Sequence, residues 1–135
     1  TPPRALDDTA AAAFAESRLA RTAAAWDSLL GRVTLRLPRA AERLARTLRA
    51  TQAYILVNQD GPAIQPGSRS YERSWIRDGS LTSAALLRTG HAERVRAFLD
   101  WYAPYQYANG KVPCCVDRRG ADPVPEHDSH GQLIY

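Results

Sequence analysis

Apolar residues recur with helical spacing in four stretches of this 135-residue chain. The first covers residues 8 to 30, where Asp7 or Asp8 is placed to cap the start of a helix. The second covers residues 39 to 57, follows Pro38 and ends at a cluster of turn-forming residues. We expect the first to be a linker or packing helix and the second to be amphipathic. The side chains of the first helix that are available for packing are Phe14, Leu19, Trp26, Leu29 and Leu30.

The other two helical stretches differ in how their apolar residues are distributed. Residues 78 to 88 are small or apolar on nearly every side, which is typical of a helix enclosed by others, and Gly90 supplies a stop. Residues 91 to 103 carry a single apolar stripe and end at Pro104, which predicts an outer helix with one face in water. The stripe consists of Val95, Phe98, Leu99 and Tyr102. Alternation of an inner helix with an outer one predicts helical hairpins.

The segments between these helices have other patterns. Residues 33 to 37 alternate apolar and polar, which predicts a short strand or an extended passage. Residues 58 to 77 contain two prolines and two glycines without a helical period, so we expect a long loop. A second long polar loop is expected over residues 117 to 127. A further helix should begin at Ser129, because Ser129 and Gln132 have the spacing of a capping box.

Composition and charge narrow the class of protein. Apolar residues make up 44% and charged residues 24% of the chain, which is ordinary for a single globular domain and excludes disordered and collagen-like classes. No apolar run approaches the roughly 18 residues that a membrane span needs. The net charge of +4 comes entirely from the first 57 residues, where Arg39, Arg43 and Arg46 line one helix face. We interpret this stripe as a solvated face, and we expect neither a nucleic-acid nor a membrane partner. Composition leaves the localisation open.

The two cysteines, Cys114 and Cys115, are adjacent in the chain. Neighbouring residues cannot easily reach ordinary disulfide geometry, so we expect reduced, buried thiols rather than a bridge. His127 and His130 raise the question of a zinc site together with these thiols. The cysteines lack the separation of two to four residues that is typical of zinc clusters, so no metal or cofactor is predicted.

Two polar loops, residues 74 to 79 and 126 to 131, each precede a helix, and one hairpin separates them. If successive helices alternate in direction, both loops lie at the same end of the molecule. Aromatic, guanidinium and carboxylate groups then converge on one ligand, as in a sugar pocket. The candidate residues are Trp75, Arg77, Asp78, Glu126, His127 and Asp128.

The Trp75-x-Arg77-Asp78 loop before a buried helix resembles the tryptophan-x-arginine-aspartate loop of glucoamylases and related six-hairpin glycosidases. The run from residue 110 through residue 131 is also similar to loops of glycosidase-like relatives, and the resemblance covers roughly residues 26 to 135. It implies an (α/α)6 toroid of twelve helices in two rings, with the sugar pocket formed by loops at the N-terminal ends of the inner helices.

The resemblance also implies roles. Arg77 and Asp78 would bind hydroxyls of a terminal sugar of a glucan or related glycoside, Trp75 would shape the pocket, and His127 would contact substrate. In glucoamylases the general acid and base lie in later loops, beyond the last residue here. Within this chain, Glu126 and Asp128 are the catalytic candidates, and Asp78 opposite one of them is an alternative pair. Hydrolysis needs two carboxyl groups roughly 5 to 10 Å apart across the bond.

Other interpretations of these residues stay open. Asp78 could cap its helix, Arg77 could form a structural ion pair with Asp78 or Glu126, and Trp75 could belong to the core. The whole chain could also be a non-catalytic helical interaction module, or a toroid that binds sugar without hydrolysing it.

The resulting expectation is an all-α fold with long polar loops. Residues 1 to 31 form an N-terminal linker or packing helix, and residues 32 to 135 begin a glycosidase-like toroid that is incomplete at its C-terminus, with about its first two helical hairpins present. We expect the parent protein to be a glycoside hydrolase-like enzyme and the 135-residue fragment to be inactive alone. Its exposed inner helix predicts association with another copy or with the missing remainder of the domain.

Overall fold

The computed structural model describes residues 7 to 135, which divide into two compact units with the boundary after Thr34. The fold is mostly α-helical. Its helices are α1 (Asp8–Leu30), α2 (Glu42–Val57), α3 (Ile76–Arg88), α4 (Ala92–Tyr102) and α5 (Ser129–Ile134). None of the helices in the described residues is long and apolar enough to cross a membrane.

Helix α1 belongs to the first unit and has the predicted bounds. Asp7 caps it, because its Oδ1 accepts a hydrogen bond from the backbone N–H of Ala10 at 2.7 Å. No residue of α1 is buried, and Phe14 and Leu19 are mostly exposed. The helix is therefore confirmed, but its apolar side chains are not packed within this unit.

Helix α2 opens the second unit and follows a short 3-10 turn, Arg39–Ala41. The strand considered for residues 33 to 37 does not form, and residues 34 to 38 have no regular structure. Leu44 is 65% exposed, whereas Gln52 and Leu56 near the other end are buried. The apolar face predicted for α2 is thus packed only in its last turns.

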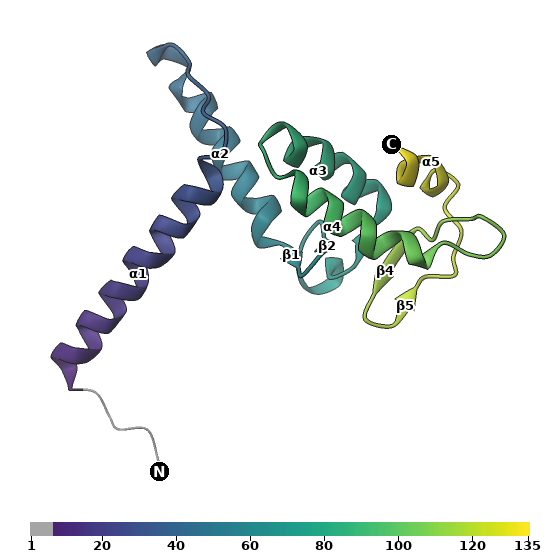
Figure 1. The fold of residues 1–135 in the computed structure, drawn as a ribbon, viewed down its shortest axis with the longest axis horizontal. Coiled ribbons are helices and arrows are strands. Elements are labelled where there is room, and N and C mark those ends of the chain that lie inside the picture. Colours follow the sequence, from purple (N-terminus) through teal and green to yellow (C-terminus); the bar gives the residue numbers. More distant parts are fainter. Residues whose placement is uncertain (1–6) are drawn as a thin grey trace. The chain divides into compact units, whose positions relative to one another are not determined.

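Helices α3 and α4 form a hairpin whose two helices lie side by side (Figure 1). Gly90 ends α3 with a φ of 83°, a left-handed conformation that glycine adopts without strain, and the next residue, His91, donates its N–H to the carbonyl of Leu86. The predicted stripe of α4 is buried, except that Leu99 is 40% exposed. The largest fully buried side chains near this hairpin are Ile64, Ile76, Leu86, His91, Phe98 and Tyr102.

Two small antiparallel sheets occupy the segments that the sequence predicts to be long loops. Their strands are β1 (Gln59–Asp60), β2 (Ala63–Ile64), β3 (Ser74–Trp75), β4 (Cys115–Asp117) and β5 (Gly120–Ala121). One sheet pairs β1 with β2, and the other has the order β3-β4-β5. The expected helical class is confirmed as a mostly α-helical fold, with these small sheets inside the loop segments. The sequence does not reveal them because strands of two or three residues are too short to show a period of two.

Buried side-chain hydrogen bonds connect the small sheets to each other and to helix α4. The Ser74 hydroxyl at the start of β3 donates to the carbonyl of Ile64 in β2 at 2.7 Å. The Tyr102 hydroxyl at the end of α4 donates to the carbonyl of Pro113, just before β4, at 3.0 Å. These groups are buried, so the bonds satisfy polar atoms that would otherwise be costly to enclose. The first bond joins the two sheets, and the second joins the segment before β4 to the end of α4.

Candidate functional site

Arg77 joins the two polar loops. It is the second residue of α3, and its Nη1 donates to Oε2 of Glu126 at 2.9 Å and to Oδ2 of Asp128 at 3.0 Å. Both carboxylates precede α5, which packs against α3. The structure thus brings together the loops that were expected to converge, and the pairing of Arg77 with Glu126, one of the structural alternatives, is present.

The ion pairs shift the pKa values of Asp128 and Arg77 in the directions that favour their charged forms. The hydrogen bond from Arg77 lowers the pKa of Asp128 below its ordinary value, and the bonds to Asp128 and Glu126 raise the pKa of Arg77. All three side chains are between one third and one half exposed, so water screens their attraction. Asp128 is consequently a carboxylate at neutral pH, which suits hydrogen-bond acceptance better than proton donation.

Glu126 and Asp128 are not arranged like the two carboxyl groups that lie on either side of the glycosidic bond in a glycosidase. Their bonded oxygens are at most about 6 Å apart, because both accept from the same nitrogen of Arg77. This upper limit is shorter than the separation of roughly 6.5 to 9.5 Å in inverting glycosidases, and the space between the two oxygens holds a guanidinium nitrogen. In this arrangement the pair binds a cation, and a sugar bond between them would require Arg77 to move.

Asp78 is half-buried in the first turn of α3. The N-cap of α3 is Trp75, without a side-chain capping bond, and the first N–H of the helix, on Ile76, donates to the carbonyl of Cys114 at 3.0 Å. The capping role considered for Asp78 is therefore wrong. Among the described residues, its carboxylate has neither a hydrogen-bond nor an ion-pair partner. The helix dipole stabilises a negative charge at this position, so Asp78 is an available acceptor beside Arg77.

Trp75 is half-buried at the end of β3, opposite Cys115 of β4. The guanidinium carbon of Arg73 lies 5.7 Å from the centre of its ring, within the range of a cation–π interaction. The ring of Tyr71, 6.3 Å away between centroids, is tilted against it. Trp75 is therefore not a fully buried core residue, although Arg73 and Tyr71 lie against part of its ring.

Arg73 is a member of the site region that sequence reasoning missed. Its Nε donates to Asp117 at 3.0 Å and its Nη2 donates to Asp122 at 2.5 Å. These bonds raise the pKa of Arg73, with the bond to Asp122 as the largest cause. Asp117 also pairs with Arg119, which is the main cause of the lowered pKa of Asp117. The only sequence signal was a cluster of acids and arginines, which does not specify a partner 44 residues away.

The predicted capping box before α5 does not form. Asp128 occupies the N-cap position, and the buried hydroxyl of Ser129 has no hydrogen-bond partner in the described part of the chain. Gln132, the expected second member of the box, accepts instead from the Ser80 hydroxyl at 2.5 Å. This bond is a second polar link between α3 and α5.

The two histidines of the second loop have different surroundings. His127 is exposed, and its ring forms no hydrogen bond with another described residue. The Nδ1 of His130 accepts from the backbone N–H of Val112 at 3.1 Å. Neither histidine lies with Cys114 and Cys115, whose thiols are free and buried as predicted. His127 is thus accessible to a ligand, whereas His130 positions α5.

An apolar groove of about 620 Å³ runs along α3, α4 and α5. Its apolar lining residues are Ile76, Ala84, Leu87, Val95, Phe98, Leu99, Leu133, Ile134 and Tyr135. Trp75, Arg77 and Asp78 do not line it. The polar candidate site is therefore separate from this groove and lies at the open surface.

The chain was compared with models of protein families, with curated protein sequences and with solved structures. None of the three comparisons finds a match. The chemistry of the site therefore follows from its residues and from their arrangement.

Proposed function

We propose that this chain is part of a glycoside hydrolase-like catalytic domain and that the Arg77 cluster binds a terminal sugar of a glucan or related glycoside. The observation that carries the proposal is the bridging of Glu126 and Asp128 by Arg77, next to the partnerless carboxylate of Asp78. The cluster consists of Trp75, Arg77, Asp78, Glu126, His127 and Asp128.

The chemistry of a sugar matches these groups. Each hydroxyl of a pyranose both donates and accepts a hydrogen bond, so neighbouring hydroxyls are bound well by a guanidinium beside carboxylates. Arg77 is 44% exposed, and Asp128 is exposed to the same extent, so both are accessible from solvent. The uncovered part of the Trp75 ring offers an apolar surface for the hydrophobic face of the sugar.

Within this proposal the carboxyl groups have unequal roles. Arg77 holds Asp128 as a carboxylate, so Asp128 serves as an acceptor or a base rather than as an acid. Glu126 is the other proposed catalytic carboxyl group, and Asp78 opposite Glu126 or Asp128 is the alternative pair. This assignment needs the sugar to displace Glu126 from Arg77, which exposed ion pairs permit because they contribute little stability.

The proposal extends to the fold around the site. The α3–α4 hairpin has the inner and outer character of one toroid hairpin, since α3 carries the site residues at its N-terminal end and α4 is amphipathic. Leu81 and Leu87 of α3 are more than half exposed. In a toroid, neighbouring hairpins would cover these side chains.

A second candidate is sugar binding without hydrolysis. It is favoured by the sharing of one cation between Glu126 and Asp128, which leaves no gap for a scissile bond between them. A helical interaction module without sugar chemistry is the remaining alternative, and the arginine face and the exposed leucines of α2 support it.

Calorimetric titration with maltose and with an iminosugar tests the proposal. We expect binding that falls at least about tenfold in Arg77→Ala and in Asp78→Ala, because each loses a charge-assisted hydrogen bond. The matched control is Arg96→Ala, which removes an arginine that is 86% exposed on α4. Unchanged affinity in both site variants, or no binding by the unmodified chain, would refute the sugar site. Hydrolysis of a glucan by the parent enzyme, lost in Glu126→Gln, would distinguish an enzyme from a binding module.

A further inference from the structure

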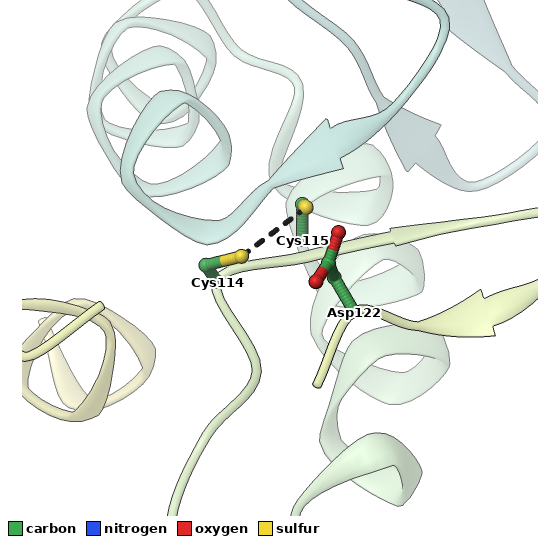
Figure 2. Close-up of side chains that lie close together, drawn as sticks. All are labelled: Cys114, Cys115 and Asp122. Atoms are coloured by element: carbon green, nitrogen blue, oxygen red, sulfur yellow. Dashed lines mark hydrogen bonds between the residues drawn. The ribbon is translucent and has the colours of Figure 1, made fainter. Parts of the chain in front are cut away.

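Two thiols and one carboxylate, none of which belongs to the Arg77 cluster, form a compact cluster of their own. Sγ of Cys114, Sγ of Cys115 and a carboxylate oxygen of Asp122 all lie within 4.8 Å of one another. Figure 2 shows the two sulfur atoms beside the Asp122 carboxylate. Both cysteines are buried and Asp122 is half-buried, so the cluster lies just below the surface.

The backbone conformation at Cys114 and Cys115 places their two sulfur atoms on the same side of the chain. Successive side chains of a strand point to opposite faces, yet the two sulfur atoms are only 3.3 Å apart. Cys114 precedes β4, and its carbonyl accepts from the N–H of Ile76. Cys115 is the first residue of β4, and its carbonyl accepts from the N–H of Asp122 at 2.9 Å. Tertiary hydrogen bonds thus hold the pair, and the last of them also positions the carboxylate.

The same backbone disfavours oxidation of the pair to a disulfide. Adjacent Cα atoms are about 3.8 Å apart across a trans peptide, whereas disulfides usually join Cα atoms that are about 4.4 to 6.8 Å apart. Bridging Cys114 and Cys115 would distort the peptide between them, whose carbonyl is bonded to the start of α3, and would strain the following carbonyl, which is bonded to Asp122. The pair is therefore arranged as a persistent dithiol.

We propose that Cys114, Cys115 and Asp122 bind a thiophilic divalent cation of the Zn²⁺ class, with the fourth coordination position left to water. Two thiolates on one tetrahedral zinc ion lie roughly 3.8 Å apart, close to the spacing of these sulfur atoms. Spacing along the sequence gives no indication of the site because the third ligand, Asp122, reaches the thiols only through the pairing of β4 with β5. Binding releases both thiol protons to solvent.

The charges around the cluster are suited to such an ion. Two thiolates, one carboxylate and one divalent cation sum to a single negative charge, and Arg73, bonded to Asp122, supplies the balancing positive charge. Asp122 already accepts from Arg73 on Oδ2 and from the N–H of Val124 on Oδ1, and a carboxylate retains further lone pairs for a metal. These bonds orient the ligand, as outer-shell partners do in metal sites. Sulfur ligands select against Mg²⁺ and Ca²⁺.

The experiment uses the reduced 135-residue chain without a histidine tag and measures Zn²⁺ binding by competition with a chelating dye. We expect one ion per chain, and Cd²⁺ should give the ultraviolet charge-transfer band of cadmium–thiolate bonds. Because the chain has only two cysteines, that band reports this pair alone. Absence of the band, or of 1:1 binding, would overturn the proposal without any variant.

Variants identify the ligands. Cys114→Ser and Cys115→Ser should abolish the band and lower zinc affinity by at least about 100-fold, and Asp122→Asn should lower it about 10-fold or more. The matched control is Asp117→Asn, because Asp117 also pairs with Arg73 but lies outside the cluster. Asp117→Asn should bind zinc normally.

Zinc binding that survives in both serine variants, or that is equal in Asp122→Asn and Asp117→Asn, would contradict the site. Circular dichroism checks the folding of each variant, and the cadmium band of the unmodified chain tests the site if a variant does not fold.

Discussion

Gly79 lies directly against the ring of Phe98, so that a Cβ added to Gly79 would be 2.2 Å from Cζ of that ring. Only a residue without a side chain fits here between α3 and the Phe98 ring of α4, and Gly79 is the residue that follows Asp78. The absence of a side chain at Gly79 therefore sets the position of the first turn of α3, from which Arg77 reaches the loop before α5.

Replacing Gly79 with alanine should destabilise the fold. Phe98 is fully buried and cannot move away freely, so overpacking should cost about 1 to 3 kcal/mol of unfolding free energy, measured by urea denaturation. Gly131→Ala is the control, because a Cβ there meets nothing within 4 Å, and alanine in a helix should be neutral or gain about 0.4 to 1 kcal/mol. Equal stability of the two variants would show that the α3–α4 contact is looser than described.

Removing the guanidinium of Arg77 should change the titration of Asp128. Arg77 lowers the pKa of Asp128, so Arg77→Met should return it towards the ordinary value of about 4. A carboxyl group whose pKa is lowered by folding stabilises the folded state above its unfolded pKa, and that contribution is lost as pH falls through the folded pKa. Carboxyl-carbon NMR titration of both proteins measures the shift. Arg96→Met should leave Asp128 unchanged, and an unaltered Asp128 in Arg77→Met would contradict the ion pair.

Arg73 should contribute more to stability than its exposed neighbour Arg118. Arg73→Ala leaves Asp117 and Asp122 without their shared partner, and these side chains are only 10% and 18% exposed. We expect a loss of about 1.5 to 3 kcal/mol at neutral pH, the range for hydrogen bonds to charged groups. Arg118→Ala, which removes an ion pair to Glu72 at the surface, should change stability by less than about 0.5 kcal/mol. Both values come from denaturant unfolding curves.

The pH dependence separates charge from packing in this comparison. A hydrogen bond from the Val124 N–H, followed by the bond from Arg73, lowers the pKa of Asp122. The stabilisation is therefore present above about pH 4 and declines as pH falls through the lowered value. The difference between the unmodified chain and Arg73→Ala should shrink on acidification. A difference that is constant down to acid pH would mean that Arg73 acts through packing on Trp75 instead.

Local signals in the sequence were sufficient for parts of the fold. The cap at Asp7, the stop at Gly90 and the apolar stripe of α4 each depend on residues within a few positions, and the helices that they predict are present. The meeting of Arg77 with Glu126 was also predictable, because short connections make successive helices alternate in direction.

Long-range contacts explain what the sequence did not reveal. Helix α3 begins at Ile76 rather than Asp78 because the carbonyl of Cys114 satisfies its first N–H. The capping box at Ser129 fails because Ser80 binds Gln132. In each case a local motif competes with a partner from another segment, and spacing along the chain cannot identify that partner.

The apolar groove along α3, α4 and α5 should make the chain bind hydrophobic dyes and associate with itself. Leu87 lines the groove and is 54% exposed, and Ile134 at its edge is 88% exposed. Exposed apolar surface of this kind is unusual for a monomer. Leu87→Asp should lower the fluorescence of a bound apolar dye by about half or more and shift light scattering towards a monomer. Leu44→Asp is the matched control, because Leu44 is 65% exposed on α2 but does not line the groove. A monodisperse monomer that binds no dye before any substitution would show that these side chains do not form an adhesive surface.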